Sequence, residues 1–251
     1  MNNGSKINQM LQQLPNGSVL LASWLKDQGY SYELQQRYRK SEWLTSIGGG
    51  AMIRTGEKLS LAGAIYALQH HTGIKIHIGG RTALGLQGYA HYIELERKET
   101  LLFAEHGVKL PAWVRNNNWD TKPVLITTSF LPEDTGLVDF KEKEFNLLIS
   151  GAARAMMECL FLTPGHFDLE EAMQMMEGLN LLKPGVVQDL LEQCRSVKVK
   201  RLFLYFAERA GHSWFKQLQL NKIDLGSGKR SLVTDGVLVR EYNITLPKHL
   251  A

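Results

Sequence analysis

Residues 17–54 read GSVLLASWLKDQGYSYELQQRYRKSEWLTSIGGGAMIR, and this stretch decides the fold of the N-terminal part of the chain. Ser18 is positioned to cap a first helix, and Gly29 can take the left-handed conformation that ends a helix. Ser31 is positioned to cap a second helix, which extends to about Ser41. The pattern therefore predicts two short helices joined by a tight turn.

A hairpin is predicted directly after these helices. Residues 43–47 and 51–54 have the composition of short strands, and three consecutive glycines between them form a flexible tip. An amphipathic helix over residues 7–14 precedes the whole segment. Helix, helix–turn–helix and hairpin in this order predict a winged helix-turn-helix, a fold that places one helix in the major groove of DNA.

The second of the two short helices has one face suited to reading DNA bases. On a helical wheel, Leu34 and Tyr38 define its inner face. The opposite face is short of acids and carries Tyr32, Gln35, Gln36 and Arg39, with Lys40 at its edge. Gln can bond adenine, Arg can bond guanine, and Tyr can meet a phosphate or a thymine methyl group. We therefore expect base contacts from this face, although an ordinary solvated helix face would show the same polarity.

Phosphate contacts are expected from the edge of the same helix and from the hairpin. Arg37 and Lys40 are placed to bind backbone phosphates, which supply affinity rather than sequence choice. The hairpin, including Ser46, Gly49 and Arg54, is expected to lie along the DNA backbone or in the minor groove. Charge supports this assignment, because residues 1–58 hold seven basic and four acidic residues, or +3 of the chain's net charge of +4.

The length and composition indicate a soluble protein with two domains. The chain has 251 residues, of which 44% are hydrophobic. Residues 1–93 are assigned to the DNA-binding domain, with a winged-helix core over 5–55 and a glycine-rich extension, and residues 94–251 to a larger mixed α+β domain. With neither a signal peptide nor an apolar run of about 18 residues, a cytoplasmic location away from membranes is expected.

The remaining elements follow from hydrophobic periodicity and turn residues. Helices are expected over residues 59–70, 150–162, 168–179, 184–195 and 201–210, with a helical turn at 111–113. Strands are expected at 74–78, 100–104, 124–128 and 137–148, and a final hairpin at 231–246. The fold class is therefore α+β.

No motif indicates an enzyme, a metal site or a cofactor. Residues 79–88 and 226–230 are rich in glycine and basic residues but lack the complete phosphate-loop pattern. Arg81 is expected either to pair with an acid or to bind a DNA phosphate. Lys198, Lys200 and Arg201 form a second basic cluster, interpreted as solvated or as a contact for nucleic acid or an acidic partner. Cys159 and Cys194 lack metal-ligand spacing and are interpreted as buried thiols.

Three stretches together resemble a known family. They are GSVLLASWLKDQG, LQQRYRKSEWLTSIGGGAMIRTG and IHIGGRTALGLQGYAHYI. Their order is similar to that in AbiEi-type antitoxins of type IV toxin–antitoxin systems, in which a winged helix precedes a motif of the form HxGGRTAL…G…AHY. Here the motif comprises His77, Gly79, Gly80, Arg81, Thr82, Ala83, Leu84, Gly88, Ala90, His91 and Tyr92. The resemblance covers about the first 115 residues, including LPAW at 110–113.

The resemblance implies a cytoplasmic bacterial repressor that binds double-stranded DNA, in particular repeats in its own promoter. It also implies that the C-terminal domain counteracts a nucleotidyltransferase-like toxin from a neighbouring gene. Two alternatives stay open from the residues alone: a winged-helix regulator without antitoxin activity, and a protein-interaction module.

Overall fold

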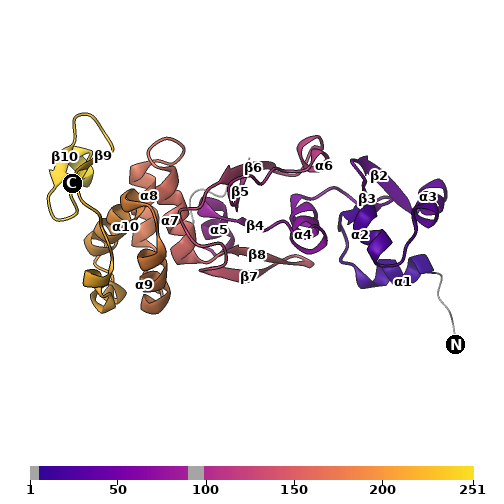
Figure 1. The fold of residues 1–251 in the computed structure, drawn as a ribbon, viewed down its shortest axis with the longest axis horizontal. Coiled ribbons are helices and arrows are strands. Elements are labelled where there is room, and N and C mark those ends of the chain that lie inside the picture. Colours follow the sequence, from indigo (N-terminus) through magenta and orange to yellow (C-terminus); the bar gives the residue numbers. More distant parts are fainter. Residues whose placement is uncertain (1–5, 90–98) are drawn as a thin grey trace. The chain divides into compact units, whose positions relative to one another are not determined.

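The computed structural model describes residues 6–89 and 99–251 (Figure 1). The chain forms two compact units, and it passes between them several times. One unit comprises residues 1–77, 98–127 and 139–148, and the other comprises residues 78–97, 128–138 and 149–251. The predicted domain boundary at residues 93 and 94, and Ala90, His91 and Tyr92 of the glycine-rich motif, lie outside the described residues.

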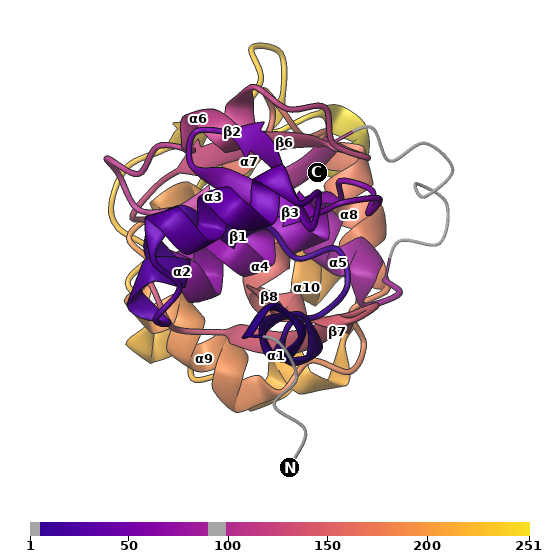
Figure 2. The same cartoon turned by 90° about the vertical axis from the view of Figure 1, so that its right-hand side faces the viewer.

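The N-terminal segment, residues 6–54, contains three helices and three short strands. They are α1 (Lys6–Gln13), β1 (Leu20–Leu21), α2 (Ala22–Asp27), α3 (Tyr32–Lys40), β2 (Leu44–Gly48) and β3 (Ala51–Arg54). The strands form an antiparallel sheet in the order β1-β3-β2. Helix α3 contacts β2 and lies toward the viewer in Figure 2.

The predicted local signals explain most of this segment. The Leu34 N–H donates to Ser31 Oγ at 3.3 Å, so Ser31 caps α3 as expected. Gly29 has a φ of +83°, the left-handed conformation predicted after α2. A small core joins the helices to the sheet, and it consists of Ile7, Met10, Leu20, Leu25, Tyr30, Tyr38, Leu44 and Met52.

Ser18 does not cap α2, so this prediction is wrong. The Ser18 hydroxyl instead donates to the Pro15 carbonyl at 2.7 Å. Leu20 and Leu21 pair with Met52 and Ala51 of β3, and this pairing holds the chain extended until the helix begins at Ala22. Sequence periodicity does not reveal so short a strand, because two residues cannot show alternation.

The chain continues into a five-stranded sheet with flanking helices. After α4 (Leu61–His71) the strands are β4 (Ile76–Ile78), β5 (Glu99–Ala104), β6 (Lys122–Thr127), β7 (Leu137–Glu142) and β8 (Phe145–Ser150). Their order is β6-β5-β4-β8-β7, and the β5–β6 and β4–β8 pairs are parallel. The short helix α6 (Ala112–Arg115) precedes β6. The predicted single strand 137–148 is two strands, because Lys143 adopts a positive φ of +55° at a turn between them.

The second unit is mainly helical. Its helices are α5 (Gly80–Leu86), α7 (Ala152–Leu162), α8 (Leu169–Glu177), α9 (Pro184–Gln193) and α10 (Val197–Arg209). The short strands β9 (Arg230–Ser231), β10 (Val237–Val239) and β11 (Ile244–Leu246) form a sheet in the order β10-β11-β9. The predicted α+β class is thus confirmed. Among the described residues, no helix is both long enough and apolar enough to cross a membrane.

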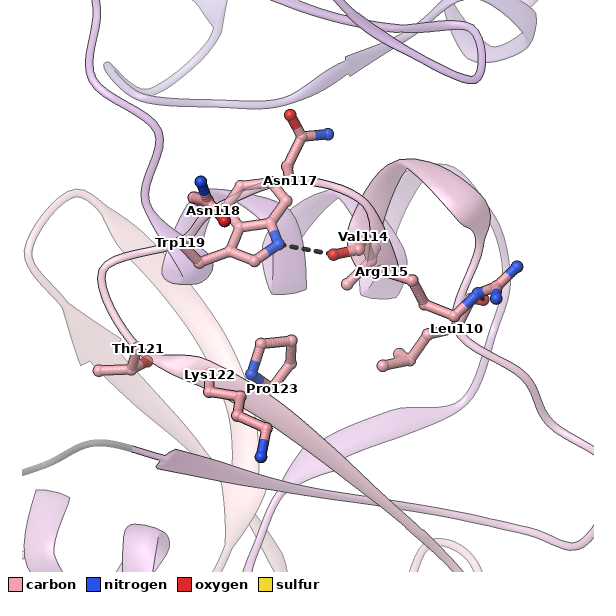
Figure 3. A pocket seen from close by; sticks show the side chains of 9 residues that line it. All are labelled: Leu110, Val114, Arg115, Asn117, Asn118, Trp119, Thr121, Lys122 and Pro123. Atoms are coloured by element: carbon pink, nitrogen blue, oxygen red, sulfur yellow. Dashed lines mark hydrogen bonds between the residues drawn. The ribbon is translucent and has the colours of Figure 1, made fainter.

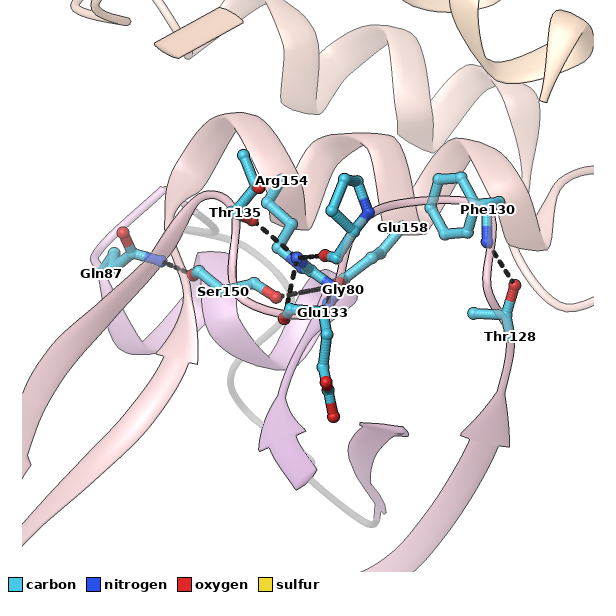
Figure 4. Close-up of polar contacts among 10 residues, drawn as sticks. Gly80, Gln87, Thr128, Phe130, Glu133, Thr135, Ser150, Arg154 and Glu158 are labelled. Carbon is cyan, nitrogen blue, oxygen red and sulfur yellow. Dashed lines mark hydrogen bonds and ion pairs between the residues drawn. The ribbon is translucent and has the colours of Figure 1, made fainter. Parts of the chain in front are cut away.

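A buried ion pair joins four segments of the second unit (Figure 4). The carboxylate of Glu158, on α7, accepts hydrogen bonds from Arg154 Nε at 2.9 Å, from the Gly80 N–H at 2.8 Å and from Ser150 Oγ. The Arg154 guanidinium also donates to the Pro132 and Thr135 carbonyls, each at 2.6 Å. Because Glu158 is fully buried, its charge requires this complete set of donors. Gly80 is the first residue of α5, and at a φ of +53° its N–H donates to this carboxylate.

The basic cluster near the start of α10 is internal, so the predicted solvated or partner-binding role is wrong for it. Lys198 Nζ donates to the Phe161 and Thr163 carbonyls at 2.7 and 2.6 Å. Lys200 is buried. Arg201 donates to the carbonyls of Leu225, Gly226, Gly228 and Asn243. Lys198 thus binds the end of α7, and Arg201 holds the C-terminal loops. Cys159 and Cys194 are buried thiols, as expected, and burial raises both pKa values, that of Cys194 to about 11.

Mild acid is expected to destabilise the first unit through His71, which stacks on Trp24 with ring centroids 3.9 Å apart. Burial, assisted by the charge of His70, lowers the pKa of His71 from 6.5 to about 4. Below about pH 6.5 the unfolded chain binds a proton at His71 that the folded chain does not bind until about pH 4. The free energy of unfolding therefore falls as the pH drops through this window.

Melting temperatures between pH 7.5 and pH 4.5 measure this effect. His71→Phe keeps the aromatic ring and removes the titrating group, so its melting temperature is expected to fall less steeply below pH 6.5 than that of the wild type. Equal slopes for the two proteins would exclude His71 as the source.

Candidate nucleic-acid interface

Helix α3 exposes one continuous polar face. Leu34, Gln35 and Tyr38 are buried or half-buried against α2 and the sheet, and the other side of the helix is open to solvent. The exposed side chains of the predicted set are Tyr32, Gln36, Arg37, Arg39 and Lys40. The helix therefore presents two side chains that can both donate and accept hydrogen bonds, those of Tyr32 and Gln36. It also presents three cations that are able to bind phosphate.

Gln35 does not belong to this face, which corrects its predicted role in base recognition. Its side chain is only 2% exposed. Its amide Nε2 donates to the Tyr30 carbonyl at 2.7 Å and to the Ala22 carbonyl at 3.0 Å. Gln35 therefore binds one carbonyl in the turn between α2 and α3 and one in the first turn of α2, and its amide donors are not available to a base.

Two further residues beside α3 were missed by sequence reasoning. Lys26, on α2, places its ammonium group 5.3 Å from the ring centroid of Tyr32 and so adds positive charge at the start of the exposed face. Trp43, just beyond the other end of α3, is 47% exposed, and its backbone N–H donates to the Tyr38 carbonyl at 2.9 Å. The sequence places Trp43 within a few residues of three cations, and this could have indicated its place beside the exposed face. The Lys26–Tyr32 contact joins two helices, so no local sequence pattern indicates it.

Arg54 of the hairpin has a structural role, which corrects its predicted contact with DNA. Its guanidinium donates to Asn16 Oδ1 and the Leu14 carbonyl, each at 2.7 Å, and to the Leu11 carbonyl. Glu57 lies 3.6 Å away and partly balances its charge. Arg54 therefore closes the end of α1 over the sheet. Ser46, in contrast, is exposed on β2, as its predicted role requires.

The tip of the hairpin contacts helix α6 of the same unit. Gly48, Gly49 and Gly50 all have positive φ values, of +92°, +57° and +76°. A Cβ atom on Gly49 would lie 3.2 Å from Trp113 Cβ. Asn117 Nδ2 donates to the Ile47 carbonyl at 2.9 Å and to the Trp113 carbonyl at 2.7 Å. Gly49 thus permits close approach to α6. The approach of this tip to DNA stays a prediction.

A pocket of about 560 Å³ adjoins α6 (Figure 3). Its apolar wall is formed by Leu110, Val114, Trp119 and Pro123. In Figure 3 the side chains of Arg115 and Lys122 point in different directions. Lys122 pairs with Glu99 at 3.1 Å, and Arg115 Nε donates to the Leu110 carbonyl. The two cations therefore do not converge on one anion.

Arg81 lies near acids of the second unit. The pKa of Glu171 is raised by burial, and the positive charge of Arg81 opposes this rise. Arg81 also acts electrostatically on the buried thiol of Cys159. Both expected roles of Arg81, pairing with an acid and binding a DNA phosphate, stay predictions.

Two family models that match different parts of the chain name the same family. Residues 97–247 match the family described as transcriptional regulators that are AbiEi antitoxins of type IV toxin–antitoxin systems. Residues 3–95 match the N-terminal domain of AbiEi antitoxin transcriptional regulators. The crystal structure of the RV2827C protein from Mycobacterium tuberculosis has a similar fold, with a TM-score of 0.59 and 13% sequence identity over 95% of this chain and 88% of that chain. No curated protein sequence matches the chain.

The adjacent residues Gln35 and Gln36 form a matched pair for testing the two sides of α3. Gln35→Ala leaves two carbonyls without their donor and is expected to lower the free energy of unfolding by about 1–3 kcal/mol. Gln36→Ala removes only an exposed side chain and is expected to change it by less than about 0.5 kcal/mol. Urea unfolding of both variants measures the difference, and equal losses would contradict the assignment of the buried and exposed faces.

Proposed function

The chain belongs to the family of AbiEi antitoxin transcriptional regulators of type IV toxin–antitoxin systems, and we propose that it represses its own promoter by binding double-stranded DNA through a winged helix. In this proposal α2 and α3 form the helix–turn–helix, and the β2–β3 hairpin is the wing. The order of the elements in residues 6–54 supports the assignment.

The exposed face of α3 is the observation on which the proposal depends. A recognition helix lies in the major groove and contacts base edges with a few side chains. Gln36 and Arg39 have the donors and acceptors to do this, and Tyr32 is exposed at the same face. Arg37 and Lys40, together with Lys26 from α2, are exposed cations that can neutralise the flanking phosphates.

Arg39 is proposed to contact a base and Lys40 a phosphate. Removing each cation in turn should distinguish the two kinds of contact. Arg39→Ala is expected to cost about 1–3 kcal/mol on promoter DNA and to narrow the preference over a scrambled duplex. Lys40→Ala is expected to weaken both duplexes about equally and to reduce the slope of log K against log salt by about 1. Titrations of full-length protein with both duplexes at several salt concentrations measure these effects.

Lys216→Ala is the control for these titrations, because Lys216 is exposed in the second unit. It is expected to leave both affinities and the salt slope unchanged. Wild-type affinity that does not depend on sequence, or that does not change with salt, would contradict DNA recognition by this face.

The antitoxin part of the proposal concerns a nucleotidyltransferase-like toxin encoded by a neighbouring gene. Support comes from the match of residues 97–247, which include most of the second unit, to the antitoxin family. We assign the neutralising activity to this part of the chain and the repressor activity to α3.

Co-expression with the neighbouring gene product tests this division of labour. The double variant Arg39→Ala, Lys40→Ala is expected to lose repression of a promoter reporter while still rescuing growth from the toxin. Loss of rescue by this folded variant would show that the two activities are not separate. Growth arrest in the presence of the wild-type chain would contradict the antitoxin role.

A further inference from the structure

The hairpin contains a bulge at the position where it meets α6. In the pairing of β2 with β3, Ser46 lies opposite Met52 and Gly48 lies opposite Ala51, so the register shifts across Ile47. A bulged residue lies outside the regular ladder of backbone hydrogen bonds. The Ile47 carbonyl accepts its hydrogen bond from Asn117 instead, at 2.9 Å. A side chain that follows α6 thus provides what the strand pairing leaves out.

The same side chain is fixed to its own helix. Asn117 Nδ2 also donates to the Trp113 carbonyl at 2.7 Å, so one amide group links the end of α6 to the bulge. Gly49 lies against Trp113 beside this link. At the opposite edge of the tip, the Ala22 N–H donates to the Gly50 carbonyl at 2.8 Å. The tip is therefore held from two sides, by α6 and by the start of α2.

Without these contacts the tip would have little to define it. Three consecutive glycines have the widest conformational freedom of any tripeptide, and ordering them costs the most backbone entropy. Asn117 belongs to the part of the chain that matches the antitoxin family, whereas Ile47 and Gly49 belong to the part that matches its N-terminal domain. The conformation of the hairpin thus depends on residues beyond the N-terminal domain.

We propose that Asn117 is a positioning residue for DNA binding: by holding the bulge at Ile47, it fixes the β2–β3 hairpin against α6 in the orientation that DNA requires. This inference rests on the proposed function for its DNA part, while the anchoring itself does not. It follows that residues 112–117 contribute to DNA affinity without contacting DNA.

Asn117 and Asn118 provide a matched comparison in the full-length protein. Asn117→Ala removes both hydrogen bonds of the link. Asn118→Ala changes the same residue type one position away, where the side chain is exposed. Without DNA, Asn117→Ala is expected to speed hydrogen exchange at the hairpin amides of residues 46–52 and at Ala22 by about tenfold, with the amides of α7 unchanged. Asn118→Ala is expected to leave all of these rates at the wild-type values.

The same two variants are then titrated with promoter DNA. Asn117→Ala is expected to raise the dissociation constant by about three- to tenfold with an unchanged salt slope, because no phosphate contact is lost. A removed phosphate contact would instead reduce that slope. Asn118→Ala is expected to bind like the wild type.

A pair of glycine variants tests the contact by a second route. Gly49→Ala places a methyl group against Trp113, whereas Gly48→Ala has no atom within 4 Å of the new Cβ, although both positions have positive φ. Only Gly49→Ala is expected to change exchange at the amides of α6. A change at α6 in both variants, or in neither, would contradict the contact.

The outcomes separate this inference from the proposed function. If wild-type protein binds its promoter but Asn117→Ala matches Asn118→Ala in both exchange and affinity, the anchoring is wrong and the proposed function stands. Faster exchange without weaker DNA binding would also overturn the positioning role. If the wild type shows no specific DNA binding, the proposed function fails together with the DNA part of this inference, and exchange alone then decides whether Asn117 anchors the hairpin.

Discussion

The second unit depends on the buried carboxylate of Glu158. Placing that charge in the interior without partners would cost several kcal/mol, and it is tolerated because Arg154, Ser150 and the Gly80 N–H all donate to it. Three donors from different segments can meet one carboxylate only if the end of β8, the start of α5 and the first turns of α7 pack together in one arrangement. The ion pair therefore specifies an arrangement of segments, and that arrangement explains Gly80 of the GGRTAL motif, whose N–H donates to Glu158.

A second pattern recurs in both units: cationic and amide side chains satisfy backbone carbonyls that regular secondary structure leaves unpaired. Gln35 does so at a turn, Arg54 at the end of α1, and Asn117 at a bulge. Arg201 donates to four carbonyls near the C-terminus, of which that of Asn243 also accepts from the Arg230 N–H. These hydrogen bonds are buried or partly buried, so loss of the donor leaves a carbonyl with less access to water than on an open surface. Such residues look like ligand-binding residues in a sequence but stabilise the fold.

This pattern explains which parts of the fold and of the candidate interface could be predicted. Amphipathic periodicity located the predicted helices to within a few residues, and Gly29 and Ser31 marked the end of α2 and the start of α3, because these signals are local. The wheel placed Tyr32, Gln36, Arg39 and Lys40 on one face correctly. It misplaced Gln35, which lies at the border of that face, where only tertiary packing decides its exposure. The contacts of Asn117 with Ile47 and of Gly80 with Glu158 each join residues 70 or more positions apart, and no local pattern encodes them.

The corrections change how the N-terminal segment is expected to bind DNA. With Gln35 and Arg54 committed to the fold, the exposed set is smaller and lies almost entirely on α3. Under the proposed function, sequence choice has to come from a few side chains, so their orientation relative to the hairpin becomes decisive. A free, glycine-tipped hairpin could adapt to many surfaces and would add little to specificity. A hairpin whose bulge is bonded to α6 has one preferred geometry before DNA arrives, and pre-organisation of this kind makes a small set of contacts sufficient.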